Sequence, residues 1–160
     1  MNVIGGCFIG YGQGGGAPTG IAIDHNGDVF VVYRTSSGGK IVEYTGGLSG
    51  CNGTTLHVTV NAPGGMVMDK HNNLIVCSIS DYAVEIIKPP YTNISGTLAS
   101  GFENPYFVTI NKKNNLVYVG NAGLDVFVLS YPGGKTVADL GSKEGVSGAE
   151  GAVDGENFVP

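Results

Sequence analysis

The chain repeats one pattern at an interval of just over forty residues. Three segments align with one another: Ala17–Asp24, Ala62–Asp69 and Asn104–Asn111. Each has proline at its second position and ends on Asp or Asn, and a polar turn and a second apolar run follow. A shortened fourth copy occupies Gly151–Val159, with its matching residue at Asp154. The matching Asp or Asn residues stand 45, 42 and 43 residues apart, so one structural unit recurs along the chain.

Each full repeat contains four short segments of strand character separated by turn residues. The expected strands of the first repeat are Gly20–Asp24, Asp28–Tyr33, Lys40–Thr45 and Thr54–Val60. Those of the second are Gly65–Asp69, Asn73–Ser78, Ala83–Lys88 and Ser95–Ser100. Those of the third are Phe107–Asn111, Asn115–Gly120, Asp125–Tyr131 and Lys135–Leu140. A period in the forties with four strands per unit predicts an all-β fold of four-stranded antiparallel blades, a β-propeller.

The count of blades is unusual for a closed propeller. One domain is predicted over residues 1–160, with repeats at about 17–61, 62–103 and 104–148 and a partial repeat at 149–160, or about 3.5 to 4 blades. Propellers close with roughly four to eight blades. The segment Val3–Gly10 could supply the outer strand of the partial blade, either within one chain, as a four-bladed ring, or between two chains, as a dimeric ring of up to eight blades. The third alternative is a fragment whose remaining blades lie elsewhere.

The opening of the first repeat carries a family resemblance. From Pro18 it reads Pro-x-Gly-Ile-Ala-Ile-Asp-x-x-Gly-x-Val-Phe-Val. This pattern resembles the start of an NHL repeat, which is also seen in gluconolactonase-like propellers, and the resemblance covers Ala17–Val159. It implies a propeller fold and leaves the function open, because such propellers serve as enzymes, sensors, scaffolds and ligand carriers. The Arg of many NHL repeats is missing, since Lys40, Val84 and Val126 occupy that neighbourhood.

Composition fits many tight turns and argues against several function classes. The chain has 28 glycines, and its net charge is −5 with no cluster of Lys or Arg. A nucleic-acid partner is therefore not expected. No run approaches the ~18 apolar residues of a transmembrane helix, and no signal peptide is visible at the amino terminus. The family resemblance favours an extracellular or periplasmic location.

The predicted ligand face surrounds the axial channel. In a propeller, the loop before the innermost strand and the loop after the second strand share one face. Arg34 is a rare charge there and could bind a carboxylate or phosphate in a bidentate manner, and Tyr106 could stack on a sugar ring or planar ligand. For the charged residues, a solvated loop or a bridge between blades is the alternative. The predicted ligand-binding residues are Arg34, Ser80, Asp81, Asn104, Tyr106 and Asn121.

Metal binding is an alternative for three residues. Asp81, Asn121 and Glu150 carry oxygen ligands of the kind that Ca²⁺ or another divalent cation prefers. Gluconolactonase-like enzymes hold a channel metal, but their ligands cannot be matched to this chain residue by residue. No cofactor is otherwise expected. The segment Asp24–Asp28 resembles the start of a calcium loop, yet no glutamate follows at the twelfth position, so hairpin-turn chemistry is the preferred interpretation.

Three functions remain open at this stage. The first is a non-enzymatic module that binds a protein partner or small ligand at the channel face, or that associates with itself as a homodimer. The second is a lactonase-like hydrolase or lyase that depends on a divalent metal. The third is an excised or designed half-propeller. No Gly-x-Ser-x-Gly, Walker, His-Glu-x-x-His or Cys-x-x-Cys motif is present, so an enzyme is less expected than a binding protein.

Overall fold

The computed structural model describes residues 16–48, 52–121 and 125–141. These residues form twelve β-strands, and no helix that could cross a membrane occurs among them. The first four strands are β1 (Ala17–Ile23), β2 (Val29–Thr35), β3 (Gly38–Tyr44) and β4 (Gly53–Val60). The next four are β5 (Pro63–Met68), β6 (Leu74–Ser78), β7 (Ala83–Ile87) and β8 (Gly96–Ser100). The last four are β9 (Pro105–Ile110), β10 (Leu116–Asn121), β11 (Asp125–Ser130) and β12 (Thr136–Leu140).

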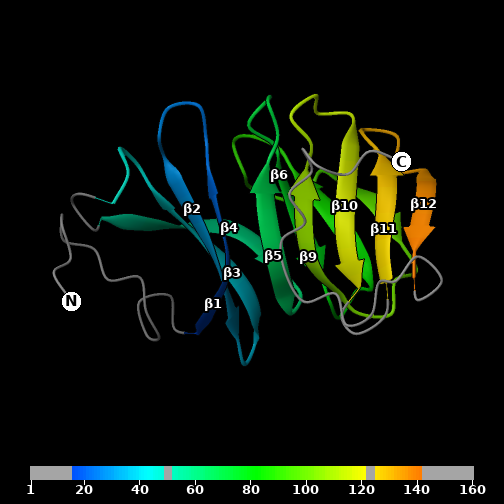
Figure 1. The fold of residues 1–160 in the computed structure, drawn as a ribbon. Helices are drawn as coiled ribbons and strands as arrows, with labels where there is room; N and C mark the ends of the chain where they lie inside the picture. Colours follow the sequence, from blue (N-terminus) through cyan, green and yellow to red (C-terminus); the bar gives the residue numbers. More distant parts are fainter. Residues whose placement is uncertain (1–15, 49–51, 122–124, 142–160) are drawn as a thin grey trace, which may run out of the picture.

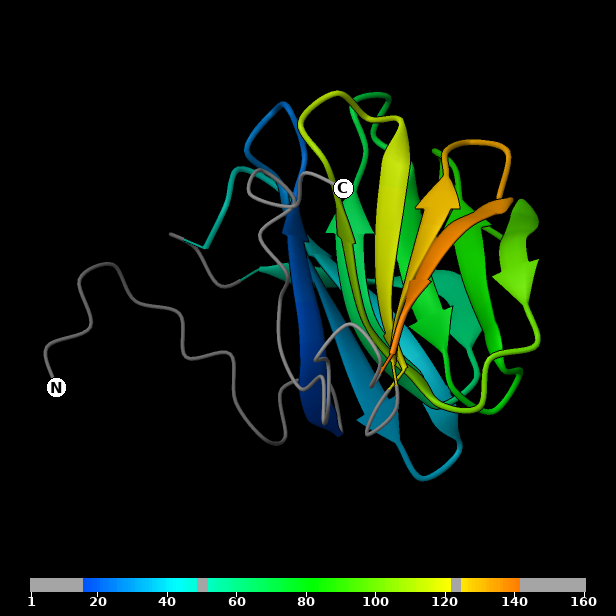
Figure 2. The ribbon, with the colours of Figure 1, turned by 45° about the vertical axis from the view of Figure 1, so that its right-hand side comes forward.

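The strands form three four-stranded antiparallel sheets, each with its strands in chain order. We call them blade I (β1–β4), blade II (β5–β8) and blade III (β9–β12). The blades lie side by side (Figure 1), and β1, β5 and β9 are neighbours as the innermost strands. Figure 2 shows the same stack after rotation. All twelve predicted strands are confirmed, and their ends differ from the predicted ends by three residues or fewer.

Each innermost strand begins at or beside a proline and carries an irregularity there. The predicted strands start two or three residues later, because proline has no N–H to donate to a sheet. In the structure the register shifts by one residue next to each proline, as in a β-bulge, which is a position where a strand tolerates proline. The paired residues at these sites are Pro18 with Tyr33, Pro63 with Ser78, and Pro105 with Asn121.

Apolar side chains from both faces of the middle strands fill the interfaces between blades. In β6, Leu74 and Val76 belong to the core shared with blade I, whereas Ile75 and Cys77 belong to the core shared with blade III. All four side chains are completely buried. Coverage on both faces explains why these strands read as nearly continuous apolar runs in the sequence.

Two glycines allow the innermost strands of neighbouring blades to approach closely. A Cβ atom on Gly20 of β1 would lie 2.7 Å from the backbone nitrogen of Met66 in β5. A Cβ atom on Gly64 of β5 would lie 2.6 Å from the carbonyl oxygen of Tyr106 in β9. Both distances are far inside van der Waals contact, so glycine is required where the strands converge.

Candidate functional site

The turn between the first two strands is built in a similar way in each blade. In blade I, Asp24 Oδ1 accepts hydrogen bonds from the backbone N–H groups of Asn26 (2.8 Å) and Asp28 (2.9 Å). Asp69 in blade II and Asn111 in blade III also accept two backbone bonds through Oδ1. These turns lie at the end of the blades opposite the predicted channel face, and we call that end the turn face. The acidic pattern at Asp24–Asp28 is thus used by a hydrogen-bonded turn.

Side chains of these turns also connect one blade to the next. Asn72 Oδ1 in blade II accepts from the backbone N–H of His25 in blade I (3.3 Å) and lies 2.6 Å from its Nδ1. Asn114 Oδ1 in blade III accepts from the backbone N–H of Lys70 in blade II (2.7 Å). Successive turns are therefore held in a row along the turn face.

Asp69 is the most completely hydrogen-bonded side chain of the turn face. It is 2% exposed, and its Oδ2 accepts from the Tyr131 hydroxyl (2.6 Å) and from Nδ2 of Asn73 (2.8 Å). Burial by itself raises the pKa of Asp69, but the hydrogen bonds from Tyr131, Asn73 and His71 outweigh burial and leave the pKa below its usual value. Burial and the contact with this carboxylate raise the pKa of Tyr131. The pair joins blade II to blade III.

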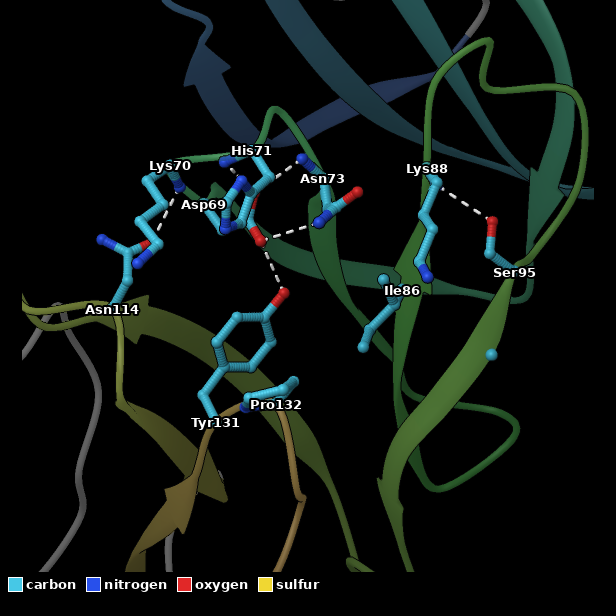
Figure 3. A pocket seen from close by; sticks show the side chains of 11 residues that line it. Asp69, Lys70, His71, Asn73, Ile86, Lys88, Ser95, Asn114, Tyr131 and Pro132 are labelled. Atoms are coloured by element: carbon cyan, nitrogen blue, oxygen red, sulfur yellow. Dashed lines mark hydrogen bonds between the residues drawn. The ribbon is translucent and has the colours of Figure 1, made fainter.

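A pocket of about 470 Å³ opens beside this pair, between blades II and III. Figure 3 shows Lys70 and Lys88 on opposite sides of it, with Tyr131 and Pro132 on the side of blade III. Its volume lies in the range of small-molecule sites. We call it the turn-face pocket. Its lining residues are Asp69, Lys70, His71, Asn73, Ile86, Lys88, Ser95, Gly96, Asn114, Tyr131 and Pro132.

At the opposite end of the blades, the structure brings two predicted residues together. The guanidinium carbon of Arg34 lies 5.2 Å from the ring centroid of Tyr106, a cation–π arrangement that reaches from blade I to blade III. Nε and Nη2 of Arg34 both donate to the carbonyl oxygen of Pro63 in blade II, at 3.2 and 2.9 Å. Arg34 therefore bridges three blades, which was the alternative to ligand binding.

The other predicted ligand residues form separate pairs. Asp81 accepts from the Ser78 hydroxyl (2.6 Å) and from Nδ2 of Asn61 (3.1 Å). The backbone N–H of Asn104 donates to Oδ1 of Asn121 (2.6 Å), whose amide nitrogen donates to Oδ1 of Asp125 (3.0 Å). Each of these hydrogen bonds therefore lies within one blade or joins that blade to the loop that leads into it.

No metal site is assembled from the part of the chain that the structure describes. Within residues 16–48, 52–121 and 125–141, no three His, Cys, Asp or Glu side chains are grouped so that they could hold an ion. Glu150 lies outside the described residues, as do Cys7 and Cys51. Ser80 is exposed in the turn after β6. Cys77 is completely buried, which raises the pKa of its thiol.

One acidic side chain in the interface between blades I and II has no counterpart in the other blades. Glu85 pairs with Val76 in the sheet, at the position that Val42 occupies in blade I and Phe127 in blade III. It is 6% exposed, and its Oε2 is fully buried with no hydrogen-bond partner among the described residues. Burial, and to a lesser degree the charge of Asp81, raise its pKa to about 7.

The face of blade I that points away from blade II exposes apolar residues of its innermost strand. Ile21 and Ile23 are 55% and 60% exposed. The matching residues of blade II, Met66 and Met68, are 5% exposed and partly buried, because blade I packs over them. Val31 and Val42, which pair with Ile21 across the sheet on the same side, are buried, so the exposed apolar surface is confined to the innermost strand of blade I.

Comparison with known proteins supports the β-propeller fold and does not assign a family or an activity. No family model matches the chain, and no curated protein matches it. Among solved structures, one chain of a nidogen/laminin complex superposes with a TM-score of 0.66 and 16% identity over 81% of this chain and 49% of that one. Hydrazine synthase of Kuenenia stuttgartiensis gives a TM-score of 0.60 and 17% identity over 88% and 41%. Streptogramin B lyase gives 0.55 and 13% over 72% and 38%.

The described chain is made of β-propeller blades. The three blades match single chains of the propeller fold at identities that show the fold alone. This chain spans less than half the length of those three chains. The activities in their names therefore belong to those proteins.

The turn-face pocket is not among the sites predicted from the sequence, which all lie at the other end of the blades. Its two sides are far apart in the chain, since Asp69 and Tyr131 are separated by 62 residues. The available signal was the placement of Lys70 and His71 in the first turn of the second repeat, together with Lys88 at the end of its third strand. In a chain with only eight Lys and Arg residues, two lysines in one repeat that meet at the same end of a blade are informative.

Proposed function

We propose that the chain is a non-enzymatic β-propeller module of the NHL and gluconolactonase-like kind, which completes its ring by association with a second copy. The observation that carries this proposal is the exposure of Ile21 and Ile23 on the innermost strand of blade I. In blades II and III the residues equivalent to Ile21 are Met66 and Val108, and each packs in the core shared with the preceding blade. Within the described residues no blade covers the innermost strand of blade I, so the contact that the other two innermost strands make with a preceding blade is open there.

A second copy is the occupant that fits this face best. The chain spans 49% and 41% of two of the propeller chains that it resembles, so two copies supply nearly the same length. A two-fold ring needs only one kind of contact, made twice, between blade I of one protomer and the far end of the other. In such a ring Arg34 and Tyr106 lie toward the shared axis, where a ligand or partner at the channel mouth would meet both protomers.

The test is the solution mass of the chain by light scattering. A dimer has twice the 16.4 kDa of the single chain, and we expect that mass. The double variant Ile21→Asp/Ile23→Asp is expected to be a folded monomer, because two buried carboxylates would oppose the contact. Val137→Asp is the matched control, since Val137 is also 60% exposed but lies on the outer strand of blade III. A monomeric parent chain, or a double variant that stays dimeric, contradicts the proposal.

A metal-dependent hydrolase or lyase is the second candidate, and the likeness to the fold of streptogramin B lyase is what favours it. Its test is the metal content of the purified chain, with Asp81→Asn and Glu150→Gln as variants. A bound divalent cation that both substitutions remove would support an enzyme over a binding module. Metal-free protein of unchanged stability after chelation would count against it.

A further inference from the structure

The turn-face pocket carries positive charge on Lys70 and Lys88. The side chains of Lys70 and Lys88 are exposed, and neither ammonium group pairs with a carboxylate within the described residues. Figure 3 shows them on opposite sides of the opening. The imidazole of His71, on the same rim, has no hydrogen-bond partner in the part of the chain described by the structure. In a chain of net charge −5, this is a local reversal of sign.

The one carboxylate of the pocket is not available to cancel that charge. Asp69 is 2% exposed and accepts four hydrogen bonds, two from backbone N–H groups, one from Tyr131 and one from Asn73. A carboxylate solvated in this way by neutral donors is stable in its charged form without a cation beside it. The hydroxyl and amide that serve it are also occupied. The donors left over for a ligand include the two ammonium groups and the imidazole, and the Ser95 hydroxyl, which accepts from the backbone N–H of Lys88, can also donate.

The walls are fixed in place before any ligand arrives. The backbone N–H of Lys70 is bonded to Asn114 Oδ1 (2.7 Å), and the backbone N–H of Lys88 is bonded to Ser95 Oγ (3.0 Å). These bonds fix the backbone at the two lysines, whose exposed side chains stay free to adjust to a ligand. Ile86 and Pro132 give the same pocket an apolar part. Because the backbone of the pocket is already held, the entropy cost of binding falls mainly on the two lysine side chains.

We propose that the turn-face pocket binds a small organic anion, whose carboxylate or phosphate lies between Lys70 and Lys88 and whose apolar portion lies against Ile86 and Pro132. Both head groups accept hydrogen bonds from ammonium groups in the same way. The volume of about 470 Å³ admits a single-ring molecule with its charged group. The site uses only blades II and III, so it does not depend on whether the chain dimerises.

The first experiment is a titration followed by amide chemical shifts, with benzoate and phenyl phosphate as probes and with benzamide and benzyl alcohol as uncharged partners of similar shape. We expect the two anions to shift the amides of Lys70, His71, Lys88 and Gly96, and we expect the uncharged compounds to leave them in place. The preferred anion identifies the head group. Added salt should weaken the binding, because the interaction is between exposed charges. Equal responses to benzoate and benzamide, or no response to any of the four compounds, would overturn the proposal.

Variants separate the pocket from a general attraction of anions to lysines. Lys70→Gln and Lys88→Gln should each weaken the bound anion by about tenfold, as expected for the loss of one charge-assisted bond. Lys113→Gln is the matched control, since Lys113 is exposed in the next turn but lines neither this pocket nor its neighbour. Gly96→Val should block binding with both lysines intact, because a Cβ at Gly96 meets no atom within 4 Å and would project into open space. Equal weakening by Lys113→Gln, or full binding to Gly96→Val, would refute a defined site.

Discussion

Replacing Glu85 with glutamine removes a titrating group from the interface between blades I and II and leaves the shape of the side chain unchanged. Glu85 is 6% exposed, and its pKa rises from a usual value of 4.5 to about 7, first because it is buried and second because Asp81 is nearby. In the unfolded chain the carboxyl returns to its usual pKa. Between these two values the folded protein holds a proton that the unfolded chain has released.

The sign of the effect follows from proton linkage. When the folded state binds more protons than the unfolded state, the free energy of unfolding falls as pH rises. The contribution of Glu85 is therefore complete below about pH 4.5, declines through the interval up to about pH 7, and is lost above it. The difference between the two pKa values corresponds to roughly 3 kcal/mol. The Oε2 atom has no partner among the described residues, so its ionised form has nothing to offset this cost.

The assay is urea unfolding of the parent chain and of Glu85→Gln at pH 5 and pH 8, followed by circular dichroism. The difference between the two proteins cancels the titration of every other group. We expect Glu85→Gln to gain stability relative to the parent between pH 5 and pH 8, by about 2–3 kcal/mol. Glu103→Gln, in the exposed loop before blade III, is the control and should show no such change. A difference for Glu85→Gln that is independent of pH would refute the reasoning.

Three further predictions test the contacts between blades. Tyr131→Phe removes a donor from buried Asp69 and should cost about 1.5–3 kcal/mol in urea unfolding at pH 7. Because the pKa of Asp69 then moves toward its value in the unfolded chain, the variant should lose less stability than the parent when the pH is lowered below the usual pKa of Asp. Gly20→Ala places a methyl group 2.7 Å from the Met66 nitrogen and should cost about 1–3 kcal/mol, whereas Gly96→Ala should be tolerated within about 0.5 kcal/mol. A double-mutant cycle of Arg34→Met and Tyr106→Leu should give a coupling free energy of about 0.5–1 kcal/mol, and a coupling of zero would mean that the two side chains do not interact in solution.

The strands and turns were predictable because they depend on local pattern and on periodicity. The Asp or Asn that closes each first strand accepts two backbone bonds in all three blades, so its spacing marks a real structural unit. The starts of the innermost strands were predicted late, because Pro63 and Pro105 read as strand boundaries while the structure uses them inside a bulge. Such a bulge depends on the partner strand and cannot be recognised in one segment alone.

The candidate sites were less predictable because they depend on how blades stack. The sequence placed Arg34 and Tyr106 on one face, and the structure brings them together. It could not show that the Arg34 guanidinium is held by a backbone carbonyl at Pro63, since that contact crosses from one repeat to the next. The turn-face pocket escaped prediction for the same reason: the hydroxyl of Tyr131 reaches Asp69 only when blade III packs on blade II.

Departures from the repeat indicate where this chain differs from a generic stack of blades. A position that is apolar in two blades and acidic in the third cannot be explained by the needs of the fold, because Val42 and Phe127 satisfy those needs in place of Glu85. The same reasoning applies to the residue that directly follows the Asp or Asn at the end of each first strand. This residue is His25 in blade I, Lys70 in blade II and Lys112 in blade III. Of these three, Lys70 is the one that lines the pocket with Tyr131. Residues that repeat build the blades, and residues that break the repeat in a buried or concave place are the ones whose role must be sought in binding.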